Sequence, residues 1–196
     1  MNVAELERQV EYKFAPVPLL AVQALANTYS YEDDEERLLD PVAAREWLVA
    51  SGLAREGVGV GELELERLRD LRAAVRGLIA ANLPETAGDG DAARGAALLA
   101  AQAPPLKSTG NGSIDLDLEP VATVEEFAAQ VAGIVFRSQL AGEWERLKIC
   151  ASDDCRWAFY DASRNRGGTW CQMEVCGNRA KNRRWRARAH DPAADG

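Results

Sequence analysis

Four cysteines, the only ones in the chain, lie in its last quarter and follow the spacing C-x4-C-x15-C-x4-C. They are Cys150, Cys155, Cys171 and Cys176. Two close pairs of thiols separated by a short span are typical of a tetrahedral zinc site, because each pair supplies two thiolates and the metal ties the pairs together. We expect one structural zinc ion, since four thiolate ligands leave no coordination position open for hydrolytic chemistry.

A strongly basic segment follows the last cysteine. Six of the ten residues from 179 to 188 are basic, namely Arg179, Lys181, Arg183, Arg184, Arg186 and Arg188. On a helix that begins near Cys176, these side chains form two neighbouring rows and one broad positive stripe. Arginine can bind a phosphate through two hydrogen bonds or read the edge of a guanine in the major groove. The six residues are therefore candidate nucleic-acid contacts, and double-stranded DNA is the expected partner.

The charge is divided unequally along the chain. The net charge of −8 by itself argues against a nucleic-acid partner. However, residues 1–145 hold 12 basic against 25 acidic residues, whereas residues 146–196 hold 11 against 6. An acidic body with one basic end repels a polyanion everywhere except at that end, and so orients the encounter. A solvated charged helix end is the alternative interpretation, and the adjacent metal site favours the binding role.

The first 145 residues predict a mainly helical body. The third expected helix has the clearest pattern, because Leu68, Leu71, Val75 and Leu78 mark one apolar face. A Gly/Asp-rich loop is expected at 84–91, and a hairpin with one buried face at 106–118, where Ile114, Leu116 and Leu118 alternate with acidic residues. The expected helices lie within 17–31, from Asp40-Pro41 to about 52, over 62–83, over 92–103, and from a capping box at Thr123-Val-Glu-Glu126 past Trp144 almost to Cys150.

The cysteine segment predicts a small fold built around its metal. Aromatic residues follow Cys155, and Gly167-Gly168 then form a turn before Trp170. We expect two short strands around this Gly-Gly turn and then a helix, which is a treble-clef arrangement. Its small core would consist of Trp157, Phe159, Trp170 and Trp185. A segment of about 45 residues cannot fold on apolar burial alone, so metal binding should supply much of its folding free energy.

Two stretches of the segment carry a specific pattern: Cys150-Ala-Ser-Asp-Asp-Cys155-Arg-Trp-Ala-Phe-Tyr-Asp161-Ala-Ser163, and Trp170-Cys171-Gln-Met173-Glu-Val-Cys176-Gly177-Asn178-Arg179-Ala-Lys181. They are similar nearly throughout to the CGNR zinc finger family. That family often has a basic stretch before its Trp-Cys, where this chain has Gly167-Gly168-Thr169, so we assign no phosphate contact to this turn. Scattered positions of the body, Leu25-Ala-Asn27-Thr28 and Leu39-Asp40-Pro41 through Trp47-Leu48 to Gly52-Leu53, resemble the ABATE domain. The resemblance implies a bacterial, stress-induced transcription regulator.

The expected fold class is mainly α (α+β), in three parts. Residues 1–143 would form the mostly helical sensor domain of the ABATE type, 144–190 the zinc finger, and 191–196 a disordered tail. A run of about 18 apolar residues, as a transmembrane helix requires, does not occur, and the first residues lack the features of a signal peptide. We therefore expect a cytoplasmic protein with no membrane partner, and a reducing compartment favours metal over disulfides.

Three kinds of function fit these observations. The first is a DNA-binding regulator whose body responds to an unidentified small-molecule effector. The second is a zinc module that docks an acidic protein surface, such as the transcription machinery, or that binds RNA. The third is an enzyme or carrier that uses the body alone. No nucleophile–base arrangement supports the third, so we do not expect an enzyme, and Asn27 within its apolar segment is expected to make a helix-face hydrogen bond. One short finger has little specificity, so a homodimer is plausible.

Overall fold

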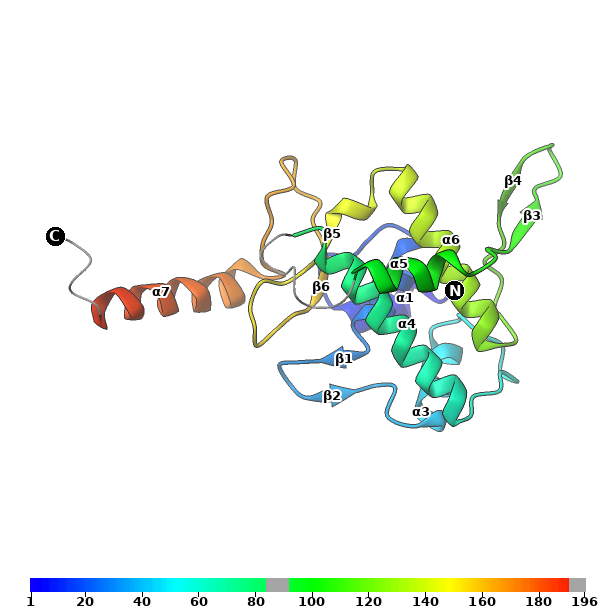
Figure 1. The fold of residues 1–196 in the computed structure, drawn as a ribbon, viewed down its shortest axis with the longest axis horizontal. Coiled ribbons are helices and arrows are strands. Elements are labelled where there is room, and N and C mark those ends of the chain that lie inside the picture. Colours follow the sequence, from blue (N-terminus) through cyan, green and yellow to red (C-terminus); the bar gives the residue numbers. More distant parts are fainter. Residues whose placement is uncertain (84–91, 191–196) are drawn as a thin grey trace.

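Helices make up most of the body, and a separate basic helix leaves it at the C-terminal end (Figure 1). The structure is a computed structural model that describes residues 1–83 and 92–190, with the backbone alone at 184 and 187–190. The fold class, mainly α with small hairpins, is confirmed. The predicted loop at 84–91 and the predicted tail at 191–196 lie outside the described residues. The described elements are α1 (Val3–Val10), α2 (Leu19–Ala26), β1 (Tyr29–Ser30), β2 (Glu35–Glu36), α3 (Pro41–Ala50), α4 (Glu62–Ala80), α5 (Ala92–Ala100), β3 (Leu106–Ser108), β4 (Ile114–Leu116), α6 (Val124–Leu140), the 3-10 turn η2 (Trp144–Arg146), β5 (Leu147–Ile149), β6 (Ala158–Tyr160), the π-turn η3 (Met173–Gly177) and α7 (Asn178–His190).

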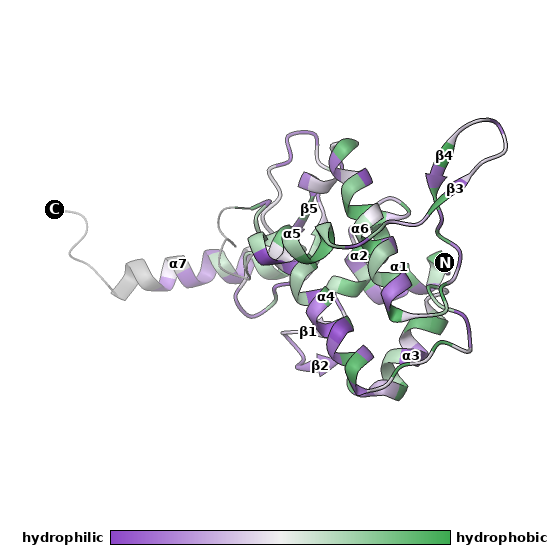
Figure 2. Ribbon diagram, turned by 45° about the vertical axis from the view of Figure 1, so that its right-hand side comes forward, coloured by the Kyte–Doolittle hydropathy of each residue, from purple (hydrophilic) through white to green (hydrophobic). Residues whose placement is uncertain are grey.

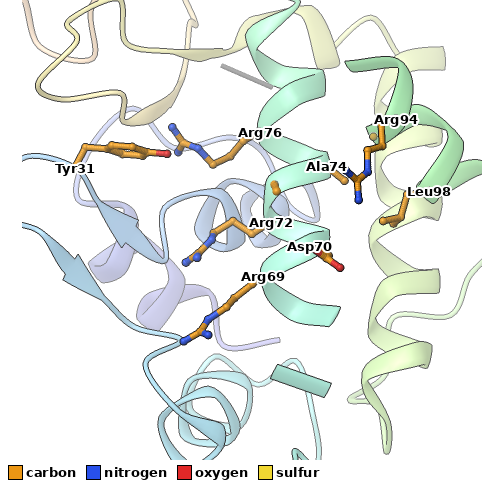
Figure 3. Close-up of a pocket in the computed structure, with 10 residues that line it drawn as sticks. Tyr31, Arg69, Asp70, Arg72, Ala74, Arg76, Arg94 and Leu98 are labelled. Carbon is orange, nitrogen blue, oxygen red and sulfur yellow. The ribbon is translucent and has the colours of Figure 1, made fainter. Parts of the chain in front are cut away.

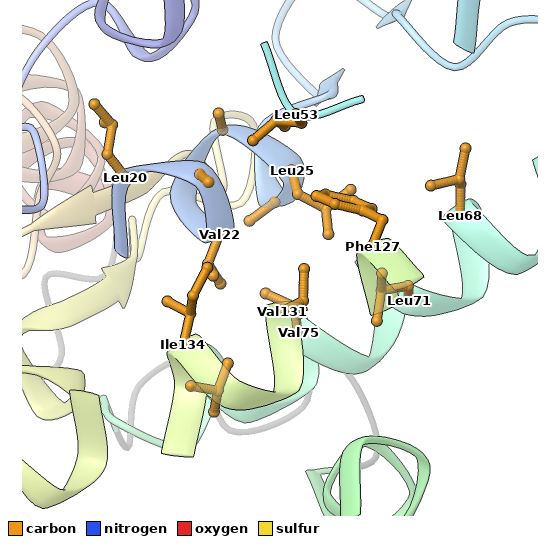
Figure 4. Packing of buried hydrophobic residues seen from close by; sticks show 14 of the residues in the cluster. Leu20, Val22, Leu25, Leu53, Leu68, Leu71, Val75, Phe127, Val131 and Ile134 are labelled. Carbon is orange, nitrogen blue, oxygen red and sulfur yellow. The ribbon is translucent and has the colours of Figure 1, made fainter. Parts of the chain in front are cut away.

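The core of the body forms around α2, all of whose residues are buried. A helix that is apolar on every side is stable only when other elements surround it. Helices α4 and α6 supply that cover, and Leu25, Leu71 and Phe127 meet between them (Figure 4). The helices of the body carry many hydrophobic residues, whereas the described part of α7 is hydrophilic (Figure 2).

The helix starts that the sequence predicted are present. The Asp40 carboxylate accepts a hydrogen bond of 2.8 Å from the Ala43 amide at the start of α3. Thr123 and Glu126 form the predicted capping box of α6, in which each side chain accepts from the other residue's amide. These caps satisfy amides that have no partner within the helix.

Helix α6 does not continue to the cysteines, so that prediction is wrong. The helix ends at Leu140, and Gly142 adopts a φ of +67°. The Gly142 amide donates to the Gln139 carbonyl and the Glu143 amide donates to the Ser138 carbonyl, which together form a Schellman motif. A glycine in this left-handed conformation ends a helix, and the chain leaves it as η2 and β5.

The β3–β4 hairpin has the predicted strands, but its apolar side is covered only near the base, where Leu116 and Leu118 pack partly against the core. Lys107 pairs with Asp115 in an antiparallel register. The hairpin extends away from the body (Figure 1), and the side chains of Leu106 and Ile114 are 65% and 72% exposed. Alternation of apolar and polar residues identified the strands and could not show how far along the hairpin the body covers them.

Within the described ranges, no helix is long and apolar enough to cross a membrane.

Candidate metal centre and basic helix

The four cysteine sulfurs converge on one point. All four Sγ atoms lie within 4.8 Å of one another, and all four residues are buried. The Cys155 and Cys171 sulfurs are 3.5 Å apart, and those of Cys171 and Cys176 are 3.7 Å apart. Zinc–sulfur bonds of about 2.3 Å in a tetrahedron place the sulfurs about 3.8 Å apart. The four free thiols therefore fit one zinc ion with no open coordination position.

The first pair of ligands lies in the loop of a β-hairpin. Strand β5 ends just before Cys150, β6 begins shortly after Cys155, and the two strands pair with Lys148 opposite Phe159. The Ser152 carbonyl accepts from the amides of Cys155 and Arg156, which closes the tight turn between the two ligands. Of the two strands predicted around Gly167-Gly168, the first is present as β6, but 169–170 form no strand and β6 pairs with β5 around the first cysteine pair instead. Strand β5 was read as helix because three residues are too few for an alternating pattern to be told from a helical one.

The second pair of ligands lies at the start of the basic helix. A π-turn, η3, contains Cys176, whose amide donates to the Gln172 carbonyl at 3.0 Å. Helix α7 follows directly, as the sequence predicted. The zinc site therefore sets the position and direction of α7, because two ligands hold the turn from which the helix begins.

Crowding of the buried thiols raises the pKa of three of the four and lowers the pKa of Cys150, whose thiolate accepts hydrogen bonds from Cys155 and Cys171. Hydrogen bonding to Cys150 raises the pKa of the Cys155 thiol, and it raises the pKa of the Cys171 thiol to about 12. Burial raises the pKa of the Cys176 thiol. Several thiolates at one buried point repel one another, and a bound divalent cation stabilises them. Metal binding at this site should therefore release protons.

A buried ion pair holds the segment that joins the two ligand pairs. The Lys148 ammonium donates to the Asp161 carboxylate at 2.9 Å, and the side chains of both are 4% exposed. Burial alone would raise the pKa of Asp161, but hydrogen bonds from Ser163, Lys148 and the Gly168 amide hold it below its usual value. A Cβ atom at Gly168 would lie 2.8 Å from the Asp161 carboxylate, so this position needs glycine for a close approach. No pattern in the sequence predicts this pair, since residues 13 apart in sequence give no signal of contact.

The free edge of β6 is bonded to the body. The Asn27 side-chain amide donates to the Ala158 carbonyl at 2.9 Å and accepts from the Ala158 amide at 2.8 Å. Gln23 donates to the same carbonyl, and the Tyr160 amide donates to the Lys13 carbonyl. Asn27 is therefore the partner of a strand 131 residues away, where the sequence had suggested only a bond on its own helix face.

Some of the aromatic residues near the cysteines are buried beside the metal site, and one is exposed to solvent. Trp157 and Phe159 are buried against the cysteines, and Trp170 and Tyr12 pack on them in part. The Trp157 indole donates to the Val10 carbonyl at 3.0 Å, so α1 also contacts this cluster. Trp185 is 72% exposed, and its predicted place in the core is wrong. It lies beyond the reach of the cluster because α7 extends away from the metal (Figure 1).

The six basic candidates of α7 do not share one environment. Arg179 donates to Glu32 of the β1–β2 connection at 2.6 Å, and Arg183 donates to Asp154 at 2.7 Å. Lys181 and Arg186 are exposed. Residues 184 and 188 lie on the same helix, but only their backbone is described. Two of the predicted contacts thus face carboxylates of the protein itself, and their partners come from segments that helix periodicity could not reveal.

A helical body joined to a four-cysteine site from which a basic helix begins defines a zinc-finger protein. Comparison with known families matches residues 146–189 to the CGNR zinc finger. Residues 21–141, more than half of the chain, match the ABATE family, described as "Putative stress-induced transcription regulator". The chain therefore belongs to the ABATE family and carries a CGNR zinc finger. A search of curated proteins finds no match.

Proposed function

We propose that this protein is a transcription regulator that binds double-stranded DNA through α7, with its zinc ion in a structural role. The observation that carries the proposal is the direction of α7, which leaves the acidic body (Figure 1) and carries the exposed basic residues Lys181 and Arg186. A helix of this kind fits the major groove, and its arginines can bind phosphates or base edges. The protein belongs to the ABATE family, whose description as a stress-induced transcription regulator supports the same function.

The contacts of α7 suggest different roles for its basic residues. Arg179 pairs with Glu32 and so orients the helix relative to the body, whereas Arg183 pairs with Asp154 and so ties the helix to the loop of the first cysteine pair. Lys181 and Arg186 are exposed on the surface of α7, which puts them within reach of a phosphate. One helix contacts few base pairs, and we expect two copies of the protein to bind a target with two half-sites.

Trp185 favours a second candidate, which is single-stranded nucleic acid or RNA. Its indole is 72% exposed among the basic residues. Unpaired bases stack on exposed aromatic side chains, whereas bases within a duplex are not accessible for stacking. Competition between duplex DNA, single-stranded DNA and RNA of one sequence separates these candidates.

We also place the protein in the cytoplasm, where a reducing environment keeps its thiols available for zinc.

The first experiment is selection from a random duplex library with the zinc-loaded protein. A Lys181→Ala/Arg186→Ala variant removes two exposed charges from α7, and Arg45→Ala/Arg137→Ala removes the same charge from the body. Enrichment of one motif by the wild type and the body variant, and its loss in the α7 variant, would establish sequence-specific binding by α7. The symmetry of the motif reports the number of copies bound.

Salt dependence tests the phosphate contacts separately. If about five basic side chains neutralise phosphates, the logarithm of the binding constant falls with the logarithm of the salt concentration at a slope of about −4 to −5. The α7 variant should reduce the magnitude of that slope by about two, and the body variant should leave it unchanged. A slope near zero for the wild type would refute binding through phosphates, and would favour a protein partner.

A further inference from the structure

A cavity of about 350 Å³ lies on the body, over α4 and between the β1–β2 hairpin and α5 (Figure 3). Arg69, Arg72 and Arg76 reach it from α4 and Arg94 reaches it from α5, with Tyr31 in the opposite wall. The three arginines of α4 are at i, i+3 and i+7, which places them along one side of the helix. Asp70 is the acidic residue in the lining. An acidic protein thus has a cavity in which positive side chains predominate.

The arginines of α4 are held in place by hydrogen bonds. Arg69 donates to the main-chain carbonyls of Leu38 and Leu39, which orient its guanidinium without neutralising its charge. Arg76 is 5% exposed and donates to the carbonyls of Ala26 and Arg156. Arg72 forms a two-bond pair with Glu36, so its charge is offset. Donors that are fixed before binding lose little entropy when a ligand arrives, which favours recognition of an anion.

The wall of the cavity is continuous with the segment that contacts the basic helix. The Tyr31 ring lies under the guanidinium of Arg76 at 4.9 Å and under that of Arg156 at 5.6 Å. The next residue, Glu32, pairs with Arg179 of α7. An anion bound to the fixed Arg76 guanidinium would compete with the Tyr31 ring for its charge and displace the ring, which would loosen this connection. The same movement would release Arg179 from Glu32.

We propose that this cavity binds a small polyanion bearing phosphate or carboxylate groups, and that binding releases Arg179 for contact with DNA. The second step rests on the proposed DNA-binding function, whereas the first does not. A ligand shifts the arrangement of α7 only if it binds the two arrangements with different affinity, and the displaced Arg76–Tyr31 contact supplies that difference. The body would then be the sensor and the β1–β2 hairpin its link to the finger.

Calorimetric titration of the zinc-loaded full chain, without DNA, tests the cavity. Pyrophosphate and citrate are the two probes, at constant ionic strength, and the tighter of the two identifies the preferred group. Arg69→Gln should weaken binding about tenfold or more, as expected for loss of a charged hydrogen-bond donor. Asp70→Asn should strengthen it about twofold to fivefold, the size of one exposed charge interaction. The controls Arg45→Gln and Glu46→Gln change the same charges on α3 and should leave binding unchanged.

The calorimetric titrations decide whether the cavity binds an anion. Opposite shifts in the Arg69 and Asp70 variants support an anion site in the cavity, and the gain in Asp70→Asn cannot arise from misfolding. No binding of either probe at millimolar concentration, or equal binding by the wild type and both cavity variants, overturns it.

DNA titrations with and without the tighter probe test the second step. We expect the probe to increase DNA affinity of the wild type and to increase the magnitude of its salt slope by about one. The Glu32→Gln variant, in which Arg179 has already lost its partner, should show the higher slope without the probe. A probe that binds the cavity but leaves DNA affinity unchanged overturns the coupling. Absence of DNA binding in every condition counts against the proposed function and leaves the calorimetric result intact.

Discussion

Asn27→Ala should destabilise the whole protein, although Asn27 touches neither the metal site nor the basic helix. Its side chain makes two hydrogen bonds to Ala158, and both residues are buried, at 1% and 0% exposure. The Ala158 carbonyl keeps its bond from Gln23, but the Ala158 amide loses its acceptor. A buried donor left without a partner costs about 1–3 kcal/mol, and the second lost bond adds about 1 kcal/mol.

The expected loss in the free energy of unfolding is therefore about 2–4 kcal/mol. In a chain of this length, each 1 kcal/mol lowers the melting temperature by about 2–4 °C. Thermal unfolding followed by circular dichroism in the presence of zinc should thus show a fall of about 4–16 °C. Hydrogen exchange on the same variant should show faster exchange at β6.

Two further variants make the test specific. Asn27→Asp keeps an acceptor for the Ala158 amide but places a carboxylate against the Ala158 carbonyl, so its loss should be at least as large. Asn182→Ala removes an exposed side chain on α7 and should change stability by no more than about 0.5 kcal/mol. If Asn27→Ala melts within about 1 °C of the wild type, the free edge of β6 does not depend on Asn27, and the argument from buried hydrogen bonds fails.

Two other predictions concern the finger. Removal of zinc with a chelator should expose the amides of η3 and α7 to rapid hydrogen exchange, because two metal ligands hold their start, while β5 and β6 stay protected by the core of the body. Equal loss of protection in all four elements would show instead that the metal supports the entire fold. Asp161→Asn should lower stability at pH 7, and the gap from the wild type should narrow as the pH falls. The pKa of Asp161 is lower in the folded chain than in the unfolded chain, so its contribution is complete above about pH 4 and is lost progressively below it. Urea unfolding at pH 7 and pH 3.5 measures the gap, and a gap that widens in acid would contradict the assigned role of the Lys148–Asp161 pair.

Among the described helices of the body, local signals predicted α2 to α6 and missed α1, Val3–Val10. Asp40 and Thr123 mark helix starts because a cap needs only its own side chain and the next few amides. The ends were less predictable. Helix α6 stops at Leu140 because Gly142 turns left-handed, and a glycine in a helical pattern does not reveal which conformation it adopts. The apolar face of the β3–β4 hairpin is covered only in part, because Leu116 and Leu118 pack on the core and Ile114 does not, and alternation identifies a face and not its neighbour.

By itself, the amino-acid sequence determined the zinc site and the helix that follows it. Both depend on residues close together in the chain, because ligand spacing and side-chain periodicity are local properties. Only the tertiary structure decided how the finger is attached and which charges its helix meets. Asn27 bonds to Ala158, Lys148 pairs with Asp161, and Arg179 faces Glu32. Such contacts form when the core brings distant segments together, and a buried polar group then takes whichever partner the packing provides.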